Sequence, residues 1–168
     1  MRKYRESDIK ALHGFMSNSD TLRYLDWPKD EFTLEDAHSS IYDYFWAQPG
    51  RWAISLTKDS DTIGSIDIRL DKIKDLASFG YALSPKHWGK GYMPQALSAV
   101  IKLAFEELVV NKIESCFYNG NEKSGRVMEK CGMIHEGTKI EHKAYKGDYV
   151  DEIMYGITRK VYLANLAG

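Results

Sequence analysis

Apolar residues recur at helical spacing in two segments of the first third of the chain. In residues 7–16 and again in residues 33–48, hydrophobic side chains fall every three or four positions, so that they would share one face of a helix. Thr33, followed three residues later by Asp36, is typical of a helix N-cap. Because the residue before a proline avoids helical backbone, Pro28 separates the two segments. The sequence therefore predicts two N-terminal helices.

After the second helix the apolar spacing changes to every second residue, which is typical of strands. Two such segments are joined by the turn-forming sequence "KDSD", and a third ends at a proline. The predicted elements are strands at 51–57, 62–70 and 76–84, a helix from about Pro94 to Leu108, a strand at 112–119, a helix at 121–131, and closing strands at about 136–144 and 150–158. This order predicts an α+β fold with a mixed, mostly antiparallel central sheet and about four flanking helices, rather than a regular βαβ repeat.

Composition narrows the class of protein. The chain has 168 residues, which suits one domain over residues 1–168, and its net charge of −1 does not favour a nucleic-acid partner. Cys116 and Cys131 form neither a CxxC pair nor a metal-ligand cluster, so reduced thiols in the cytoplasm and no bound metal are expected. No apolar run reaches the length of a signal or membrane-spanning segment, so no membrane partner is expected.

Charge is uneven along the chain. Residues 20–43 contain seven acids against two bases, a local balance of −5. Ordinary surface composition favours a solvated helix face. The same excess could form a rim that attracts a cationic substrate, and the sequence leaves both interpretations open.

Gly89 and Gly91 flank a lysine immediately before the long helix. The first backbone N–H groups of a helix lack internal partners, and glycine lets an anion approach the backbone closely. The loop from Trp88 to Met93 thus predicts a phosphate cradle to which Lys90 adds charge, although a tight turn would give the same pattern. The loop lacks the GK[ST] of a P-loop and the third glycine of a dinucleotide fold.

Asn121 and Ser124 open a short helix directly after a strand, about thirty residues beyond the glycine loop. The order of strand, glycine loop, helix, strand, Asn-x-x-Ser and helix resembles the GNAT acyl-CoA N-acetyltransferase superfamily, and especially its ribosomal-protein N-terminal (alanine/serine) acetyltransferase branch. The resemblance covers nearly the whole chain. It is carried by the segments "YLDWP", "IGSIDI", "FGYALSPKHWGKGYMPQAL", "NEKSGRVMEKCGM" and "YKGDYVDEIMY".

The resemblance implies acetyl-CoA as cosubstrate and assigns residues to it. The central sheet would splay at the cofactor site, leaving strand backbone for the pantetheine amides and for the thioester carbonyl. Met93 departs from the glycine or alanine usual at the end of the loop. The implied cofactor-binding residues are Tyr81, Ala82 and Leu83 on the strand, Trp88, Gly89, Lys90, Gly91, Tyr92 and Met93 in the cradle, and Asn121 and Ser124 near the sulfur.

The catalytic groups are less clearly assigned. Many members of the superfamily protonate the leaving thiolate with a tyrosine, but the residue in register here is Met128. Ser124 is the alternative, unless it is only the helix N-cap. The carboxylate that some members use as a base corresponds to Lys143. Glu141, two residues earlier, is predicted to lie on the same strand face and is the candidate base. Further candidates are Asp67, Asp26 and a chain of waters.

The implied reaction is direct attack of a primary amine on acetyl-CoA in a ternary complex. The acceptor suggested by the branch is a protein N-terminal amine. A polyamine or an aminoglycoside is the alternative that the acidic segment favours. The missing tyrosine at Met128 leaves open a non-catalytic acyl-CoA-binding module. A homodimer is expected because dimers are common in such families, and the first strand of the fold is expected to be short or missing.

Overall fold

The computed structural model describes residues 1–73 and 75–167 and divides into two units. Strands β2 (Thr62–Asp71) and β3 (Leu76–Leu83) each have residues in both units. The N-terminal unit comprises Met1–Asp67 and Gly80–Tyr92, and the C-terminal unit comprises Ile68–Phe79 and the chain from Met93 onward. The strands follow one another in the sheet in the order β1-β2-β3-β4-β6-β5. The two units are described in turn.

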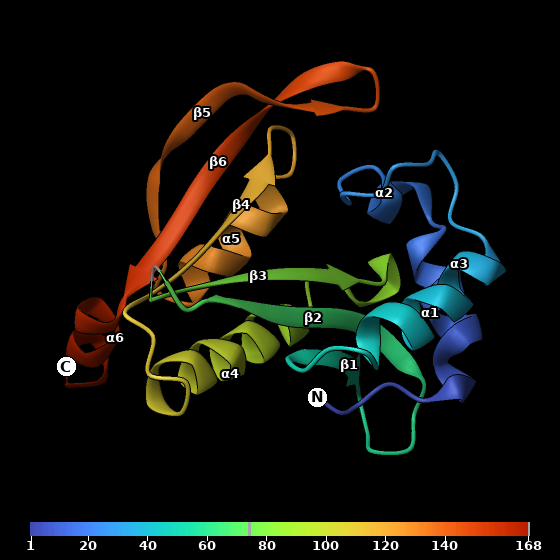
Figure 1. Ribbon diagram of the computed structural model, residues 1–168, viewed down its shortest axis with the longest axis horizontal. Helices are drawn as coiled ribbons and strands as arrows, with labels where there is room; N and C mark the ends of the chain where they lie inside the picture. Colours follow the sequence, from blue (N-terminus) through green and yellow to red (C-terminus); the bar gives the residue numbers. More distant parts are fainter. Residues whose placement is uncertain (74, 168) are drawn as a thin grey trace. The chain divides into compact units, whose positions relative to one another are not determined.

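The helices of the N-terminal unit lie in the two segments where the sequence predicted helix (Figure 1). A 3₁₀ turn, η1, leads into α1, and a π-helical turn, η2, continues α3. The short helix α2 was not predicted, since four residues are too few to show a period. The elements are η1 (Glu6–Asp8), α1 (Ile9–Met16), α2 (Ser19–Leu22), α3 (Leu34–Ser39) and η2 (Ser40–Phe45).

The predicted cap of α3 is confirmed. The Thr33 hydroxyl accepts a hydrogen bond from the Asp36 N–H at 3.1 Å, and the Asp36 carboxylate accepts one from the Thr33 N–H at 2.9 Å. This reciprocal pair satisfies backbone donors that the first turn of a helix leaves without partners. Behind it, Leu12, Ala37 and Ile41 are fully buried in the core of this unit.

Strand β1 (Arg51–Ser55) forms the predicted hairpin with β2, in antiparallel register from Arg51–Asp67 to Ser55–Thr62. On the other side of β1, Arg2 makes a single bridge to Ala53. The first strand is therefore as short as the sequence indicated.

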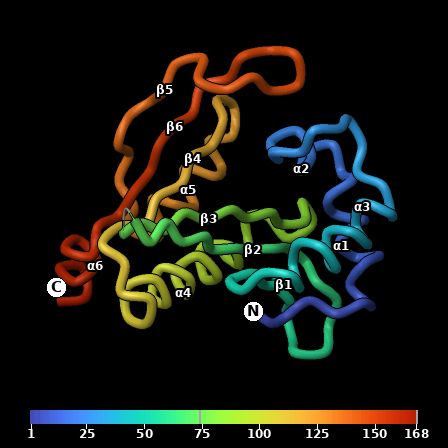
Figure 2. The backbone as a smooth tube through the Cα atoms, in the orientation of Figure 1, coloured from blue at the N-terminus to red at the C-terminus, as the bar shows by residue number. Residues whose placement is uncertain are grey.

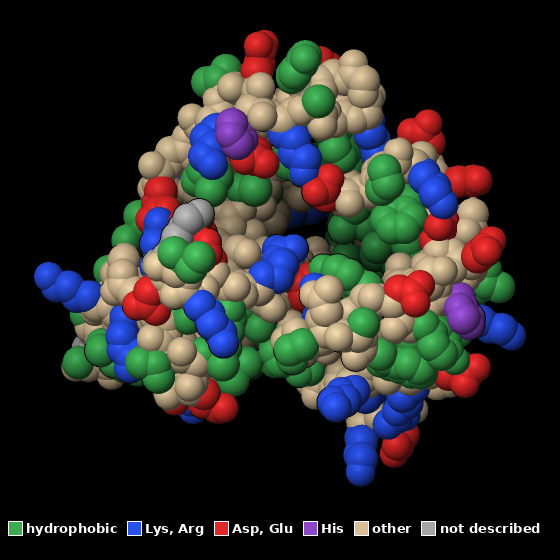
Figure 3. All heavy atoms as spheres, viewed as in Figure 1, with side chains coloured by type: hydrophobic (Ala, Val, Ile, Leu, Met, Phe, Trp, Pro, Cys, Tyr) green, Lys and Arg blue, Asp and Glu red, His purple; other side chains and the backbone are tan. Residues whose placement is uncertain are grey.

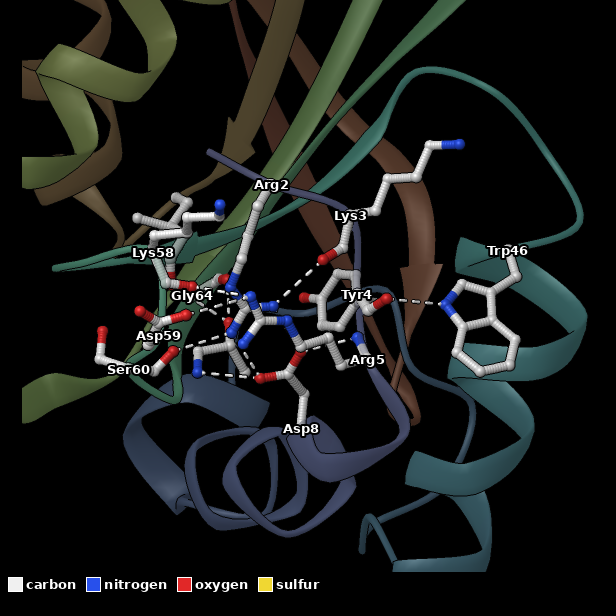
Figure 4. A network of polar contacts seen from close by, with 12 residues as sticks. Arg2, Lys3, Tyr4, Arg5, Asp8, Trp46, Lys58, Asp59, Ser60 and Gly64 are labelled. Carbon is white, nitrogen blue, oxygen red and sulfur yellow. Dashed lines mark hydrogen bonds and ion pairs between the residues drawn. The ribbon is translucent and has the colours of Figure 1, made fainter.

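A polar network holds the start of the chain against this hairpin (Figure 4). The Arg2 guanidinium donates to both carboxylate oxygens of Asp8, at 2.7 and 2.8 Å, and to the Ser60 carbonyl at 2.9 Å. The Asp8 side chain is 1% exposed. Burial alone would raise the pKa of Asp8, but the hydrogen bonds from Arg2 and from the Arg5 N–H hold it below its ordinary value.

The C-terminal unit contains the two longest strands, β5 (Ile134–Tyr145) and β6 (Asp148–Thr158) (Figure 2). Strand β6 lies between β4 and β5 and pairs antiparallel with both, while the first three residues of β3 pair parallel with β4. The sheet is mixed and mostly antiparallel, as predicted. The elements are β4 (Lys112–Tyr118), β5 (Ile134–Tyr145), β6 (Asp148–Thr158), α4 (Tyr92–Glu106), α5 (Glu122–Lys130) and α6 (Arg159–Ala167).

The packing of these helices explains which were predictable. The stripe of α4 is buried as expected: Leu97, Val100 and Ala104 are fully covered. Helix α5 ends at Lys130, and Gly132 follows at the C′ position with a φ of +79°, the left-handed conformation that a glycine stop supplies. The C-terminal helix α6 buries none of its residues and has no apolar stripe, so the prediction of about four helices was too low.

Candidate active site

The glycine loop of the N-terminal unit leads from the 3₁₀ turn η3 (Pro85–His87) into α4. Gly89 and Gly91 have φ values of +74° and +79°, in the left-handed region that side chains disfavour. A Cβ built on Gly89 meets no heavy atom within 4 Å, so space is open over the loop backbone. Because α4 begins at Tyr92 with N–H groups that lack helical partners, the loop has the geometry of an anion cradle.

The side chain of Trp88 ties this loop to the end of β3. Its indole N–H donates a 2.7 Å hydrogen bond to the carbonyl of Leu83. The N–H of His87 bonds to the Ser84 carbonyl, and the N–H of Ser84 to the Ile63 carbonyl on β2. The sequence assigned only the backbone of Trp88 to the site, and a Trp–carbonyl bond across five residues has no sequence signature.

Beyond the ladder between β3 and β4, two backbone groups of β3 are hydrogen-bonded by side chains, one from β4 and one from β2. In the C-terminal unit that ladder runs over Leu76–Ser78, and at the next residue the Phe79 carbonyl accepts from the Ser115 hydroxyl at 2.8 Å. In the N-terminal unit the N–H of Gly80 donates to the Asp67 carboxylate at 3.1 Å. The change of partners lies directly before Tyr81, the first residue of the predicted pantetheine segment.

Asp67 is a buried carboxylate on β2. The alternation of β2 placed it on a polar strand face as a surface or structural residue, and the structure buries it to 9% exposure. Besides the Gly80 N–H, its carboxylate accepts the hydroxyl of Tyr44 at 3.2 Å. Asp26, the other carboxylate considered on this part of the chain, lies exposed in the segment between α2 and α3.

Strands β2 and β3 approach closely at Gly64. A Cβ built there would lie 2.6 Å from the Ala82 carbonyl oxygen and 2.9 Å from a methyl of Leu83. Only glycine fits without displacing the β3 backbone. Gly64 is thus a residue that shapes the candidate site and that sequence reasoning missed.

The C-terminal unit brings Asn121 and Ser124 together at the start of α5. The sequence left open whether Ser124 is only the helix N-cap, and the structure excludes that alternative: Asn121 is the N-cap, and the Ser124 N–H donates to its carbonyl at 2.9 Å. Ser124 is the third helical residue and is buried. Met128, one turn further, is 1% exposed, so no proton donor stands where many related enzymes have a tyrosine.

Glu141 lies on β5 in an irregular stretch. The pairing register of β5 with β6 shifts between Lys139 and Lys143, and Glu141 has a φ of +46°. Its side chain is exposed, and its backbone N–H donates to the Asp151 carboxylate at 2.8 Å. The argument that Glu141 and Lys143 share a face assumed regular alternation, which this bulge interrupts.

Neither cysteine is activated as a nucleophile. Burial raises the pKa of Cys116 to about 11, with the Glu152 carboxylate adding to the shift. Burial also raises the pKa of Cys131, whose thiol lies 3.4 Å from the Pro94 carbonyl. Both thiols stay protonated near neutral pH, which favours direct attack over a route through an acyl-cysteine.

On the face drawn in Figure 3, the acidic segment does not form one continuous patch. Acidic side chains around the N-terminal helices are interspersed there with basic and apolar ones. Asp36 is already engaged, since the hydrogen bond from Lys29 at 2.7 Å and those from Thr33 lower its pKa to about 2. In the described part of the chain, no three His, Cys, Asp or Glu side chains gather as a metal site requires, and no described helix is long and apolar enough to cross a membrane.

Residues 1–134 match the family model of the acetyltransferase (GNAT) domain. The chain belongs to the GNAT family. As a GNAT protein it is an N-acetyltransferase, and the family uses acetyl-CoA. The N-acetyltransferase YoaA of Bacillus subtilis is 27% identical over 164 residues, which cover 95% of this chain and 92% of YoaA. A GNAT acetyltransferase structure from Bacillus anthracis has a TM-score of 0.85 at 28% identity, covering 95% of this chain and 93% of that one.

Two further GNAT comparisons differ in the acceptor that their names state. The ribosomal-protein-serine acetyltransferase of Escherichia coli is 24% identical over 153 residues, covering 88% of this chain and 85% of that protein. The spermidine N-acetyltransferase of Vibrio cholerae, in complex with CoA and spermine, has a TM-score of 0.79 at 21% identity and covers 96% of both chains. At that identity the second comparison supports the fold alone.

Proposed function

We propose that this GNAT domain, acting as a single domain over residues 1–168, transfers the acetyl group of acetyl-CoA to the N-terminal amine of a protein by direct attack in a ternary complex. The observation that carries the proposal is the loop at the start of α4. Two left-handed glycines, open space over Gly89 and the N–H groups of a 15-residue helix together fit a pyrophosphate.

Acetyl-CoA supplies a thioester, an activated acyl group with a good leaving group. The backbone of Trp88–Met93 would hold its pyrophosphate, and Lys90 would add positive charge. The pantetheine is proposed to bind the backbone of Tyr81, Ala82 and Leu83, where the Leu83 carbonyl already accepts the Trp88 indole N–H. An N–H there would polarise the thioester carbonyl.

The catalytic assignments remain proposals. Ser124 is proposed to stabilise the departing sulfur by a hydrogen bond, with Asn121 beside it. Glu141 is the proton acceptor that the resemblance suggests. Because its side chain is exposed, Glu141→Gln should test this role with little effect on folding. We further propose that the enzyme is a cytoplasmic homodimer, as expected for such families.

The acceptor is proposed on the similarity to a ribosomal-protein-serine acetyltransferase, which extends over 88% of this chain. A small cationic amine is the second candidate, because residues 20–43 carry seven acids against two bases. The spermidine enzyme supports this alternative only through its fold.

The first experiment is a calorimetric titration with acetyl-CoA, with ATP and NAD as controls. Release of free thiol is then followed with peptides that begin with Ser or Ala, their N-terminally blocked forms, spermidine and an aminoglycoside. Micromolar acetyl-CoA binding together with turnover of free but not blocked peptides supports the proposal. Turnover of spermidine alone would make a small cationic amine the acceptor in place of a protein N-terminus. A folded protein that does not bind acetyl-CoA would contradict the proposal as a whole.

A further inference from the structure

A buried carboxylate in the N-terminal unit joins a strand backbone to a tyrosine. Asp67, 9% exposed, accepts the Gly80 N–H on one oxygen at 3.1 Å and the Tyr44 hydroxyl on the other at 3.2 Å. Burying a charged group is costly unless it is well bonded, and Asp67 was a further candidate for the base in the sequence. Its surroundings therefore bear on what it does.

Tyr44 extends from this carboxylate toward solvent. Its side chain lies on the π-helical turn η2 and is 37% exposed, whereas Asp67 is buried. The Arg51 guanidinium lies over the Tyr44 ring, 3.3 Å from its centroid, and donates to Gln48 at 2.6 Å. The stacked arginine holds the ring in place, so the hydroxyl is a fixed link between an accessible ring and a buried base.

The position of this link along β3 connects it with the reaction. Gly80, which Asp67 binds, immediately precedes the Tyr81–Leu83 segment proposed to hold the thioester. Because a strand rises about 3.3 Å per residue, a thioester carbonyl bound to that segment would lie within roughly 10 Å of Gly80. Asp67 and the Tyr44 hydroxyl bonded to it therefore adjoin the start of the segment proposed to hold the thioester.

We propose that Tyr44 and Asp67, in place of Glu141, form the proton relay for the acceptor amine. The proposal rests on the proposed function. As the amine nitrogen bonds to the thioester carbon, a proton passes from nitrogen to the Tyr44 oxygen while the Tyr44 proton passes to Asp67. The C–S bond then breaks with its electron pair on sulfur, and Asp67 returns one proton through Tyr44 to the thiolate or to solvent. The products are the amide and the free thiol.

The test uses substitutions that remove the proton-carrying group of Asp67 or Tyr44 and keep the size of each side chain. Asp67→Asn keeps the shape of the side chain and one oxygen that can accept from the Gly80 N–H, but its amide cannot take up a proton and places an NH₂ group toward the Tyr44 hydroxyl. Tyr44→Phe keeps the ring under Arg51 and removes only the hydroxyl. The matched controls are Tyr42→Phe, on the same turn, and Asp59→Asn, whose side chain is 90% exposed near the same hairpin.

Both relay variants are expected to lose about 10²-fold in kcat, because general-base catalysis contributes roughly 10²–10⁴-fold. Acetyl-CoA affinity and thermal stability should stay near wild type, and the double variant should lose little more than either single one. The kcat of the wild type should level off with rising pH, whereas that of Asp67→Asn should keep rising with hydroxide.

Several results would overturn the relay. One is a wild-type kcat in Tyr44→Phe, and another is a loss of kcat in Glu141→Gln but in neither relay variant. A third is a loss of kcat in Asp67→Asn that parallels weakened acetyl-CoA binding, which would give Asp67 a positioning role alone. If Asp67→Asn does not fold, Tyr44→Phe with its pH profile decides the question. Failure of the wild type to bind acetyl-CoA would instead count against the proposed function.

Discussion

The indole N–H of Trp88 donates a 2.7 Å hydrogen bond to the carbonyl oxygen of Leu83, so that the cradle loop is fastened to the strand from which it leaves. This bond sets the start of the loop relative to the last residue of β3. In the proposed function the loop that begins at Trp88 binds the pyrophosphate, and the strand segment that ends at Leu83 binds the pantetheine. The bond therefore provides a direct test of whether the two segments act as one site.

Trp88→Phe removes this donor and keeps an aromatic ring. A net hydrogen bond is worth about 1 kcal/mol, so acetyl-CoA affinity is expected to fall about five- to tenfold in a calorimetric titration. Trp46→Phe is the matched control, since the Trp46 indole donates to the Tyr4 carbonyl at 3.0 Å in the same unit. An equal loss of affinity in both variants would indicate general loosening rather than a role at the cradle.

Gly64→Ala tests the close approach of β2 to β3. Its Cβ would lie 2.6 Å from the Ala82 carbonyl oxygen, and overpacking against backbone costs about 1–3 kcal/mol. Urea unfolding should show that loss, and acetyl-CoA affinity should fall with it because β3 must shift. The control is Gly14→Ala on α1, where a Cβ meets nothing within 4 Å and alanine should stabilise the helix by about 0.5–1 kcal/mol.

Gly89→Ala tests the anion cradle. With φ at +74° and no neighbour within 4 Å, alanine pays only the backbone cost of the left-handed region, about 1–2 kcal/mol. Gly147→Ala, in the turn between β5 and β6, has a φ of +86° and equally open space, so it should lose similar stability. Acetyl-CoA binding should weaken about tenfold or more in Gly89→Ala alone, because only there would the new methyl crowd a phosphate. Equal affinities in the two variants would argue against the cradle.

Local patterns made most of the fold predictable. The capping box at Thr33, the apolar stripe of α4 and the glycine stop at Gly132 are each encoded within a few neighbouring residues. Where a prediction was wrong or an element was missed, the local signal was absent or was overridden. Helix α6 has no apolar face, and the bulge near Glu141 breaks a period of two that the residue types alone would permit.

The candidate site was only partly predictable for a different reason. The cradle follows from two glycines before a helix, which is a local signal. The bonds that shape its surroundings join distant positions, such as Asp67 to Gly80 and Ser115 to Phe79. Pairing over such separations depends on strand register, which one sequence does not reveal.

Ser124→Ala tests the assignment of Ser124 to the departing sulfur. Because Asn121 and not Ser124 is the N-cap of α5, the substitution should cost less stability than the roughly 1 kcal/mol of a lost cap. In the proposed mechanism kcat should nevertheless fall about tenfold, with acetyl-CoA affinity little changed, as followed by thiol release and calorimetry. Unchanged kcat would leave Ser124 as a packing residue.

Asp8→Asn tests the network that fastens the start of the chain to the β1–β2 hairpin. Breaking a buried ion pair leaves the Arg2 charge without its partner, so a loss of about 3 kcal/mol is expected at pH 7. The sign of the pH dependence follows from the lowered pKa of Asp8: the folded protein binds its proton less readily than the unfolded chain. The stabilisation is therefore fully present above the ordinary aspartate pKa of about 4 and is lost as pH falls through the lower folded value. Urea unfolding from pH 7 to pH 3 should show a difference in free energy of unfolding between wild type and Asp8→Asn that is constant above about pH 4 and shrinks below it. The control is Asp59→Asn, whose partner Arg5 is exposed, and its free energy of unfolding should stay within about 0.5 kcal/mol of wild type throughout. A difference that persists undiminished at pH 3 would show that shape, not the charge on Asp8, holds this end of the chain.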